Sequence, residues 1–348
     1  MKLPRPFQVT RRSVQALALL LVIVTPILAR YANRLNTVEL DHLLEEQAGT
    51  AQVAVLESTD WLIRNTVVPD IEVDGRMRRD DEAAVAAAAA LQGSSWAFEA
   101  FGVRFTDPLG AVESMLAGRH MRRVLLIGLI LPLALTLLLG RVFCSWLCPV
   151  GTILELLDGL HRLTRKLGMR LGRTKLWPGD KFLVLAVGLG LTVALGLPLL
   201  GSFYPPALFG REVESGFAVF FDAGEAGAAG LTAAGLSLAS WFLIGIVFVE
   251  LLFAPRMWCR ALCPGGALYA ALGWLRPVRV RLNKSTCTDC GDCNVACGMG
   301  LDPMHGHMGI DCDNCGVCVA SCPEGSLAMG LGMGAKSGLK PKVQEPAT

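Results

Sequence analysis

Residues 287–297 read CTDCGDCNVAC, and residues 312–323 read CDNCGVCVASCP. Each stretch has the spacing Cys-x2-Cys-x2-Cys-x3-Cys, so eight of the twelve cysteines of this 348-residue chain lie close together. The other four form two pairs, and no cysteine precedes Cys144. A small secreted disulfide scaffold scatters its cysteines among loops. A dense block near one end of a long chain instead indicates metal ligation.

This spacing is typical of bacterial ferredoxins that hold two [4Fe–4S] clusters, in which the fourth cysteine of each run ligates the cluster of the other run. The pattern predicts two ligand sets: Cys287, Cys290, Cys293 and Cys322 for one cluster, and Cys312, Cys315, Cys318 and Cys297 for the other. Zinc is the weaker alternative, because zinc sites use Cys-x2-Cys knuckles separated by longer spans. Gly298 follows Cys297 where a proline is usual, a departure that removes no ligand.

The rest of the chain is strongly apolar. Hydrophobic residues make up 53% of it, charged residues only 18%, and the mean hydropathy is +0.48. A net charge of +2 gives no basis for nucleic-acid binding. Because about 20 apolar residues span a bilayer, four runs predict transmembrane helices: 14–32, 124–143, 182–201 and 236–254.

The Lys and Arg residues predict the orientation of these helices. Segment 155–181 contains seven Lys or Arg against three Asp or Glu, whereas segment 202–235 contains one against four. Positive loops stay in the cytoplasm, so we expect both termini in the cytoplasm and segments 33–120 and 202–235 in the periplasm. Arg119, Arg122 and Arg123 in the long loop run against this rule.

We therefore expect a membrane α-helical protein with four transmembrane helices, together with a small α+β ferredoxin-like domain that holds two clusters. The expected parts are a cytoplasmic N-terminus with the first helix (1–32), a periplasmic segment (33–120), helices two to four (121–275), the ferredoxin domain (276–330) and a disordered tail (331–348). Residues 150–168 have apolar positions at helical spacing. They predict either an amphipathic helix on the membrane surface or a loop that packs on the ferredoxin domain.

The two cysteine pairs lie in an internal repeat. The stretch RVFCSWLCPVGTI at 141–153 recurs as RMWCRALCPGGAL at 256–268. Cysteines four residues apart share one face of a helix, and the proline after each pair ends or restarts that helix. Cys144 and Cys148 with Cys259 and Cys263 supply four thiolates, enough for a third cluster. A redox-active dithiol and purely structural cysteines are the alternatives.

With these motifs the chain resembles the NapH/MauN family of membrane ferredoxin-type proteins and, more distantly, the NosR and CcoG groups. The resemblance covers residues 105–329, and includes TDPL at 106–109, PALFGR at 206–211 and the acidic Glu250 ahead of the second pair. Segment 33–104 is longer than we expect for this family.

The resemblance implies a multi-pass protein of the inner membrane that transfers electrons between the quinol pool and a periplasmic redox enzyme. Its expected partners are other electron-transfer subunits, ferredoxin-like or cytochrome, and that enzyme. On this hypothesis the chain is a component of a quinol dehydrogenase. The competing hypothesis is an assembly or maturation factor that supplies electrons for biogenesis or reactivation of a periplasmic metalloenzyme.

Oxidation of quinol needs proton acceptors near a cluster. Glu250 is a candidate because an ionisable residue inside a transmembrane helix is costly, and Asp107 and Arg211 are candidates on the periplasmic side. Each has a plainer alternative, as a buried partner of another polar group or, for Asp107, as a helix N-cap. The sequence contains no Cys-x2-Cys-His for c-type haem and no histidine in a predicted membrane helix. It contains no Gly-x-Gly-x-x-Gly or Walker motif either.

Overall fold

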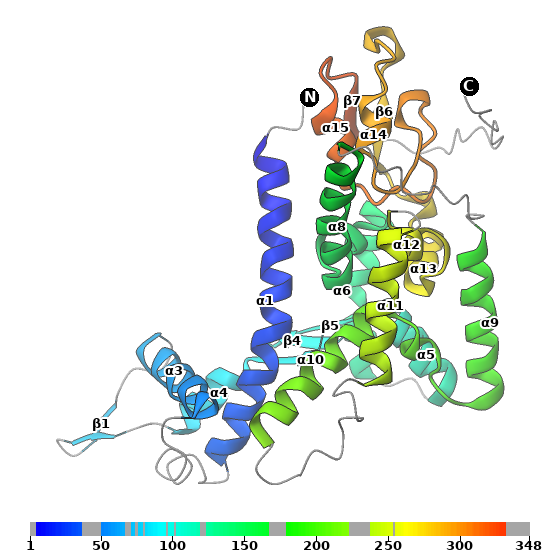
Figure 1. Cartoon of the computed structure of the whole chain (residues 1–348). Coiled ribbons are helices and arrows are strands. Elements are labelled where there is room, and N and C mark those ends of the chain that lie inside the picture. Colours follow the sequence, from blue (N-terminus) through cyan, green and yellow to red (C-terminus); the bar gives the residue numbers. More distant parts are fainter. Residues whose placement is uncertain are drawn as a thin grey trace.

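The computed structural model describes the following residues: 5–36, 50–66, 71–73, 76–78, 81–94, 97–100, 102–118, 123–166, 179–222, 237–252 and 255–331. The described chain is mostly helical, with a small β-containing block at each end of a helical bundle (Figure 1). The predicted disordered tail lies outside the described residues, apart from Leu331.

Helix α1 (Arg5–Asn36) is the longest element and runs along one side of the bundle (Figure 1). Among the described residues it contains the one helix that is long and apolar enough to cross a membrane, Phe7–Asn33. The apolar runs two to four form shorter helices: α6 (Arg123–Leu139), α9 (Asp180–Leu195) and α11 (Leu238–Leu252).

Helices α6 and α9 end earlier than the apolar runs that predicted them. Gly140 has φ 73° directly after α6, and Gly196 has φ 68° after α9. The left-handed conformation, which glycine adopts without strain, ends a helix. At the end of α9 the N–H of Gly196 donates to the carbonyl of Thr192 at 2.9 Å. Helix length alone therefore does not show four membrane spans.

Shorter helices fill the bundle between the apolar ones. They are α5 (Pro108–Gly118), α7 (Val142–Trp146), α8 (Pro149–Lys166), α10 (Pro205–Asp222), α12 (Met257–Ala261) and α13 (Pro264–Leu272), with one-turn 3₁₀ helices at Leu200–Ser202 and Gly273–Leu275. Helix α8 confirms the helical part of the prediction for 150–168. It packs against α1, α10 and α11 and buries Leu154 and Glu155, while Leu156 is exposed, so one face of α8 packs inside the bundle.

Segment 50–106 forms a block at the end of the bundle away from the ferredoxin cysteines (Figure 1). Its elements are α3 (Ala51–Thr66), α4 (Asp81–Ala89), the hairpin β1 (Ile71–Val73) and β2 (Arg76–Arg78), and the antiparallel sheet β3 (Leu91–Ser94), β4 (Ala97–Ala100) and β5 (Val103–Thr106). Tyr31 of α1 is fully buried against Leu56 and Ala84. Its hydroxyl donates to Oδ1 of Asp60 at 2.6 Å, which ties this block to α1.

The cysteine-rich block lies at the opposite end, beside the start of α1 (Figure 1). Strands β6 (Val278–Leu282) and β7 (Leu327–Leu331) form an antiparallel pair. Between them in the sequence lie α14 (Asp292–Ala296) and α15 (Val317–Ser321), with one-turn helices at Lys284–Thr286 and Pro303–His305. Nε2 of Gln8 donates to the carbonyl of Cys315 at 3.0 Å. The N-terminal end of α1 and the cysteine-rich block therefore lie on the same side of the molecule.

Candidate iron–sulfur sites

One hollow in the cysteine-rich block is lined by Cys287, Cys290, Cys293 and Cys322. Leu282, Met304 and Leu327 contribute apolar wall. Cys290 is exposed and Cys287 is half-buried, so the hollow lies near the surface. We call these four cysteines the outer set. They are the four that the spacing assigns to one cluster.

A second hollow is lined by Cys297, Cys312, Cys315 and Cys318, which we call the inner set. Cys312 and Cys318 are buried. Burial raises the pKa of Cys312 to about 11, so the free thiol would stay protonated at neutral pH. Coordination to a metal deprotonates a thiol outright. The Cys312 thiol is therefore neutral when no metal centre is bound to it.

Matching backbone turns shape both hollows. Asp289 and Asn314 have φ of 53° and 52°, a left-handed conformation that Asp and Asn tolerate better than most residues. Gly291 and Gly316 follow at φ 82° and 70° and precede α14 and α15. Each turn bends the chain so that the first three cysteines of its run face one centre.

The two cysteine pairs, here called the paired motifs, have a geometry that differs from the prediction. Cys144 lies in α7 and Cys259 in α12, but Cys148 and Cys263 lie beyond those helices. The N–H of Gly151 donates to Sγ of Cys148 at 3.2 Å, and Cys263 is in the same way the N-cap of α13. The prediction that both cysteines of a pair share one helix face is wrong. Proline favours the first turn of a new helix, so each pair spans a helix junction.

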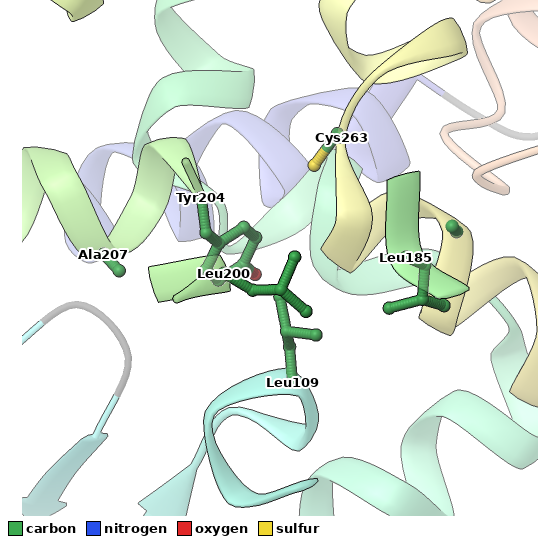
Figure 2. Close-up of a cluster of buried hydrophobic side chains, with 7 residues drawn as sticks. Leu109, Leu185, Leu200, Tyr204, Ala207 and Cys263 are labelled. Atoms are coloured by element: carbon green, nitrogen blue, oxygen red, sulfur yellow. The ribbon is translucent and has the colours of Figure 1, made fainter. Parts of the chain in front are cut away.

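The paired motifs nevertheless lie next to each other. Nη2 of Arg141, three residues before Cys144, donates to the carbonyl of Cys259 at 3.1 Å. Burial raises the pKa of Cys263 to about 12, and the nearby Cys144 thiol adds to the increase. Figure 2 shows the sulfur of Cys263 pointing into an apolar cluster that includes Tyr204 and Leu200. The structure thus brings together cysteines that lie 115 residues apart in the sequence.

Unpaired donors around these cysteines fit an iron–sulfur group. In the described part of the chain, four buried N–H nitrogens have no hydrogen-bond partner: Nε of Arg141, Nε1 of Trp146, Nε1 of Trp258 and Nε of Arg276. Trp146 lies between Cys144 and Cys148, and Trp258 directly precedes Cys259. Leaving a buried donor unpaired is costly. Cluster sulfurs accept N–H hydrogen bonds, which also tune the redox potential.

The donor set points the same way. All candidate ligands are thiols, which select zinc, copper(I) or iron–sulfur clusters over hard cations. Among the described residues no three His, Cys, Asp or Glu side chains are close enough to hold a single metal ion. A cubane spreads its four thiolates over four iron atoms, so its ligands need not converge on one point. The residues present fit [4Fe–4S] clusters at the outer and inner sets.

A buried carboxylate joins α1 to α8 beside these sites. Oε2 and Oε1 of Glu155 accept hydrogen bonds from Nη1 and Nη2 of Arg11 at 2.8 and 2.6 Å. Gln15 donates to the same carboxylate at 2.8 Å. Burial alone would raise the pKa of Glu155, but the hydrogen bond from Arg11 and the charge of Arg256 outweigh it and lower the pKa to about 2. Glu155 is therefore ionised and anchors α1.

Known proteins with similar sequences provide independent evidence for these sites. Residues 123–169 and 234–283 match the family model of a 4Fe-4S binding domain. These regions contain both paired motifs and end before Cys287. The ferredoxin-type protein NapH of Haemophilus influenzae is 32% identical over 235 residues, which cover 64% of this chain and 74% of that protein. This chain belongs to the NapH/MauN family of ferredoxin-type proteins.

Other relatives agree with this family. The methylamine utilization ferredoxin-type protein MauN of Methylobacillus flagellatus is 31% identical over 194 residues, 55% of this chain and 60% of that protein. The putative electron transport protein YccM of Escherichia coli is 30% identical over 227 residues, 62% of this chain and 57% of that protein. No solved structure matches the chain. The predicted family, the mostly helical architecture and the ferredoxin-type 4Fe-4S domain are confirmed.

The structure gives the three candidate proton acceptors of this NapH/MauN protein different surroundings. Oε2 and Oε1 of Glu250 accept the N–H groups of Met257 and Trp258 at 2.9 and 2.8 Å, so Glu250 caps the helix that carries Cys259. Arg211 is exposed and donates to the carbonyl of Gly201. These contacts give Glu250 and Arg211 structural partners, and a role of either residue in proton transfer stays a prediction.

Asp107 has a richer environment. Its Oδ1 accepts the N–H of Leu109 at 2.8 Å and so caps α5. Its Oδ2 accepts the hydroxyls of Tyr204 and Tyr269 at 2.9 and 2.6 Å. The ring of Tyr269 stacks on Phe143, the residue before Cys144, at 5.5 Å between centroids. Asp107 is thus linked through Tyr269 and Phe143 to the first paired motif.

A second group of residues was not predicted from the sequence. Arg141 forms an ion pair with Asp311, and Arg256 forms one with Asp313. A signal for them was present. The arginines hold the same position in the two repeats, and the aspartates stand on either side of Cys312.

Proposed function

We propose that this NapH/MauN-family chain is an iron–sulfur electron carrier of the inner membrane, which passes electrons between the quinol pool and a redox enzyme system. The observation that carries the proposal is the grouping of all twelve cysteines into three neighbouring sites, the outer set, the inner set and the paired motifs. Its proposed partners are other electron-transfer subunits and a periplasmic redox enzyme.

On this proposal the outer and inner sets each hold one [4Fe–4S] cluster, and the paired motifs hold a third. When bound, such clusters supply reversible one-electron transfer. Cys144 and Cys259 come from short helices, while Cys148 and Cys263 come from the helix junctions that follow. The match of both paired motifs to a 4Fe-4S binding domain supports their shared role.

The proposed topology has four transmembrane helices with both termini in the cytoplasm, and keeps the predicted domain boundaries. The start of α1 and the ferredoxin block lie on the same side, and the block formed by residues 50–106 lies on the other (Figure 1). In this topology α1 crosses the membrane once, from the cytoplasmic side to the periplasmic side. The Lys and Arg bias of segment 155–181 supports a cytoplasmic location for the ferredoxin side.

Asp107 with Tyr204 and Tyr269 is the proposed place where quinol gives up its protons. A buried carboxylate that already accepts two hydroxyl hydrogen bonds can accept a proton from a quinol hydroxyl at the same oxygen. The ring of Tyr269 stacks on Phe143, and Phe143 directly precedes Cys144. Asp107 would accept the two protons of a quinol one at a time and release each to water, while the paired motifs would hold the group that accepts the electrons.

Reduction by a quinol tests this proposal. Full-length protein, purified anaerobically in detergent with its iron, should be reduced by a soluble quinol analogue, with two electrons delivered per quinol. Asp107→Asn should slow this reduction about tenfold or more, while reduction by dithionite should keep its wild-type rate. Reduction by dithionite but never by quinol would overturn the quinol link.

A further inference from the structure

Two arginines at equivalent positions of the internal repeat extend to the same short stretch of the ferredoxin block. Arg141 stands three residues before Cys144, and Arg256 three before Cys259. Their side chains are 0% and 9% exposed. Arg141 pairs with Asp311 and Arg256 with Asp313, the two neighbours of Cys312. Both repeats therefore hold one cysteine of the inner set between them.

Arg141 connects three parts of the molecule with one guanidinium. Its Nη1 donates to Oδ1 of Asp311 at 3.1 Å and to the carbonyl of the same residue at 3.3 Å. Its Nη2 donates to the carbonyl of Cys259. The buried Lys181 of α9 forms a second ion pair with Asp311. One side chain thus lies between a paired motif and the neighbour of Cys312.

Arg256 forms the second attachment. Its Nη1 donates to Oδ2 of Asp313 at 3.2 Å, and its Nε donates to Oδ2 of Asp158 on α8 at 2.8 Å. The hydroxyl of Ser145, next to Cys144, donates to the carbonyl of Asp313 at 2.8 Å. The backbone and the side chain of Asp313 are therefore both held by residues of the repeats.

The loop after Cys297 is seated on the same surface. A Cβ atom at Gly298 would lie 2.9 Å from Oδ2 of Asp158 and 3.0 Å from Nε of Arg256. A Cβ at Gly300 would lie 2.9 Å from the guanidinium of Arg260. These approaches explain why glycine replaces the usual proline at 298. The fourth ligand of the inner set is thus held against the helical bundle as well.

The outer set lacks these attachments at the matching positions. The two cysteine runs are offset by 25 residues, so Thr286 and Thr288 occupy the places of Asp311 and Asp313. Thr286, Thr288 and Cys290 are all exposed, whereas Cys312 and Asp313 are buried. The same motif is buried against the helices in the inner run and exposed at the surface in the outer run.

We propose that Arg141 and Arg256 clasp residues 311–313 and thereby fix the order of the electron path: paired motifs, then inner set, then outer set. This inference rests on the proposed function, since it needs a centre at the paired motifs. Oxidation of one quinol releases two electrons and two protons. With clusters bound, the two electrons would pass singly along this order to two molecules of a one-electron carrier at the outer set, and Asp107 would pass the two protons one at a time to water.

Magnetic coupling between reduced centres tests the order without any activity assay. Full-length protein is reduced anaerobically with dithionite and examined by low-temperature electron paramagnetic resonance, in which neighbouring paramagnetic centres broaden and split each other's signals. Cys315→Ala removes the inner centre, and should leave two centres that no longer couple. Cys290→Ala removes the outer centre, and should leave two centres that still couple. The reverse pattern would overturn the order. A wild-type protein with about eight iron atoms and no third signal would overturn the proposed third centre, and the inference with it.

Substitution of Arg256 tests the clasp. In Arg256→Gln with wild-type iron content, the coupling between the inner centre and the paired-motif centre should weaken, and the midpoint potential of the inner centre should fall because a buried positive charge is lost. Arg256→Lys should restore part of both. Arg281→Gln removes an exposed charge on β6 of the same block, and should change neither. Unchanged coupling and potential in iron-loaded Arg256→Gln would overturn the clasp. If that variant fails to assemble, the two cysteine variants still decide the order.

Discussion

The two cysteine runs of the ferredoxin block share a motif but differ in environment. Both make the same turn, with Asp289 and Asn314 at nearly equal positive φ. The loop from Cys287 to Cys290 is exposed or half-buried, while residues 312–314 are buried against the helices. Ligand spacing therefore sets the local geometry of each run. The residues between and beside the ligands decide which run packs against the helical bundle.

The largest expected effect comes from the aspartate that the outer run lacks. Asp311→Ala leaves the buried cations Arg141 and Lys181 without their carboxylate. Removing one partner of a buried ion pair costs about 3–5 kcal/mol, so we expect a large fall in the thermal unfolding midpoint in detergent and loss of iron from the inner set.

The matched control is Thr286→Ala, at the equivalent position of the outer run, where the side chain is exposed. A surface substitution of this kind should stay within about 0.5 kcal/mol. Equal destabilisation by the two variants would contradict the claim that the inner run, but not the outer run, is held to the helices at this position.

A second difference lies at the residue after the fourth cysteine of each run. Gly298→Pro would place a Cβ within 2.9 Å of Asp158 and close to Arg256. Overpacking of this kind typically costs about 1–3 kcal/mol, and here it should lift the loop from the bundle. Iron analysis and the thermal midpoint measure the effect.

The reciprocal change, Pro323→Gly, falls at an exposed position of the second run. It should destabilise by less, about 0.4–1 kcal/mol through the entropy of the unfolded chain. A larger loss from Pro323→Gly than from Gly298→Pro would contradict the close seating of residue 298.

The smallest effect is expected when the outer run is given an acid of the inner run. Thr288→Asp copies Asp313 at an exposed position of the outer run. We expect a stability change within about 0.5 kcal/mol, and a small fall in the potential of the outer centre because a negative charge is added. Redox titration measures the shift. If the potential of the inner centre shifted and that of the outer centre did not, the assignment of Thr288 to the outer centre would be wrong.

The sequence predicted the local features of this molecule and missed the distant ones. The spacing of the two runs named the same groups of four cysteines that line the two hollows, because three ligands of each set lie within one turn and its short helix. The ends of the apolar helices were misplaced, because single glycines such as Gly140 and Gly196 stop a helix inside an apolar run. The helix-face geometry of the pairs failed because Pro149 and Pro264 each begin a new helix.

Long-range contacts could not be derived from pattern alone. Arg141 and Asp311 are separated by 170 residues, and nothing in the surroundings of either residue in the sequence specifies the other. Glu250 shows a contact of the same kind. The apolar run around this acid predicts a functional residue but does not reveal that it caps the short helix of Cys259. Asp107 was expected on the periplasmic side, and the fold brings it to Tyr269 beside the paired motifs.

The most direct test of this account is the metal content of anaerobically purified full-length chain, measured as iron and zinc per polypeptide. The account predicts about twelve iron atoms, four at each of the three sites. Cys144→Ala and Cys259→Ala should each lower this number by about four, with the same result from either motif. About eight iron atoms in the wild type and in both variants, or stoichiometric zinc in place of iron, would contradict the claim that the paired motifs share one cluster.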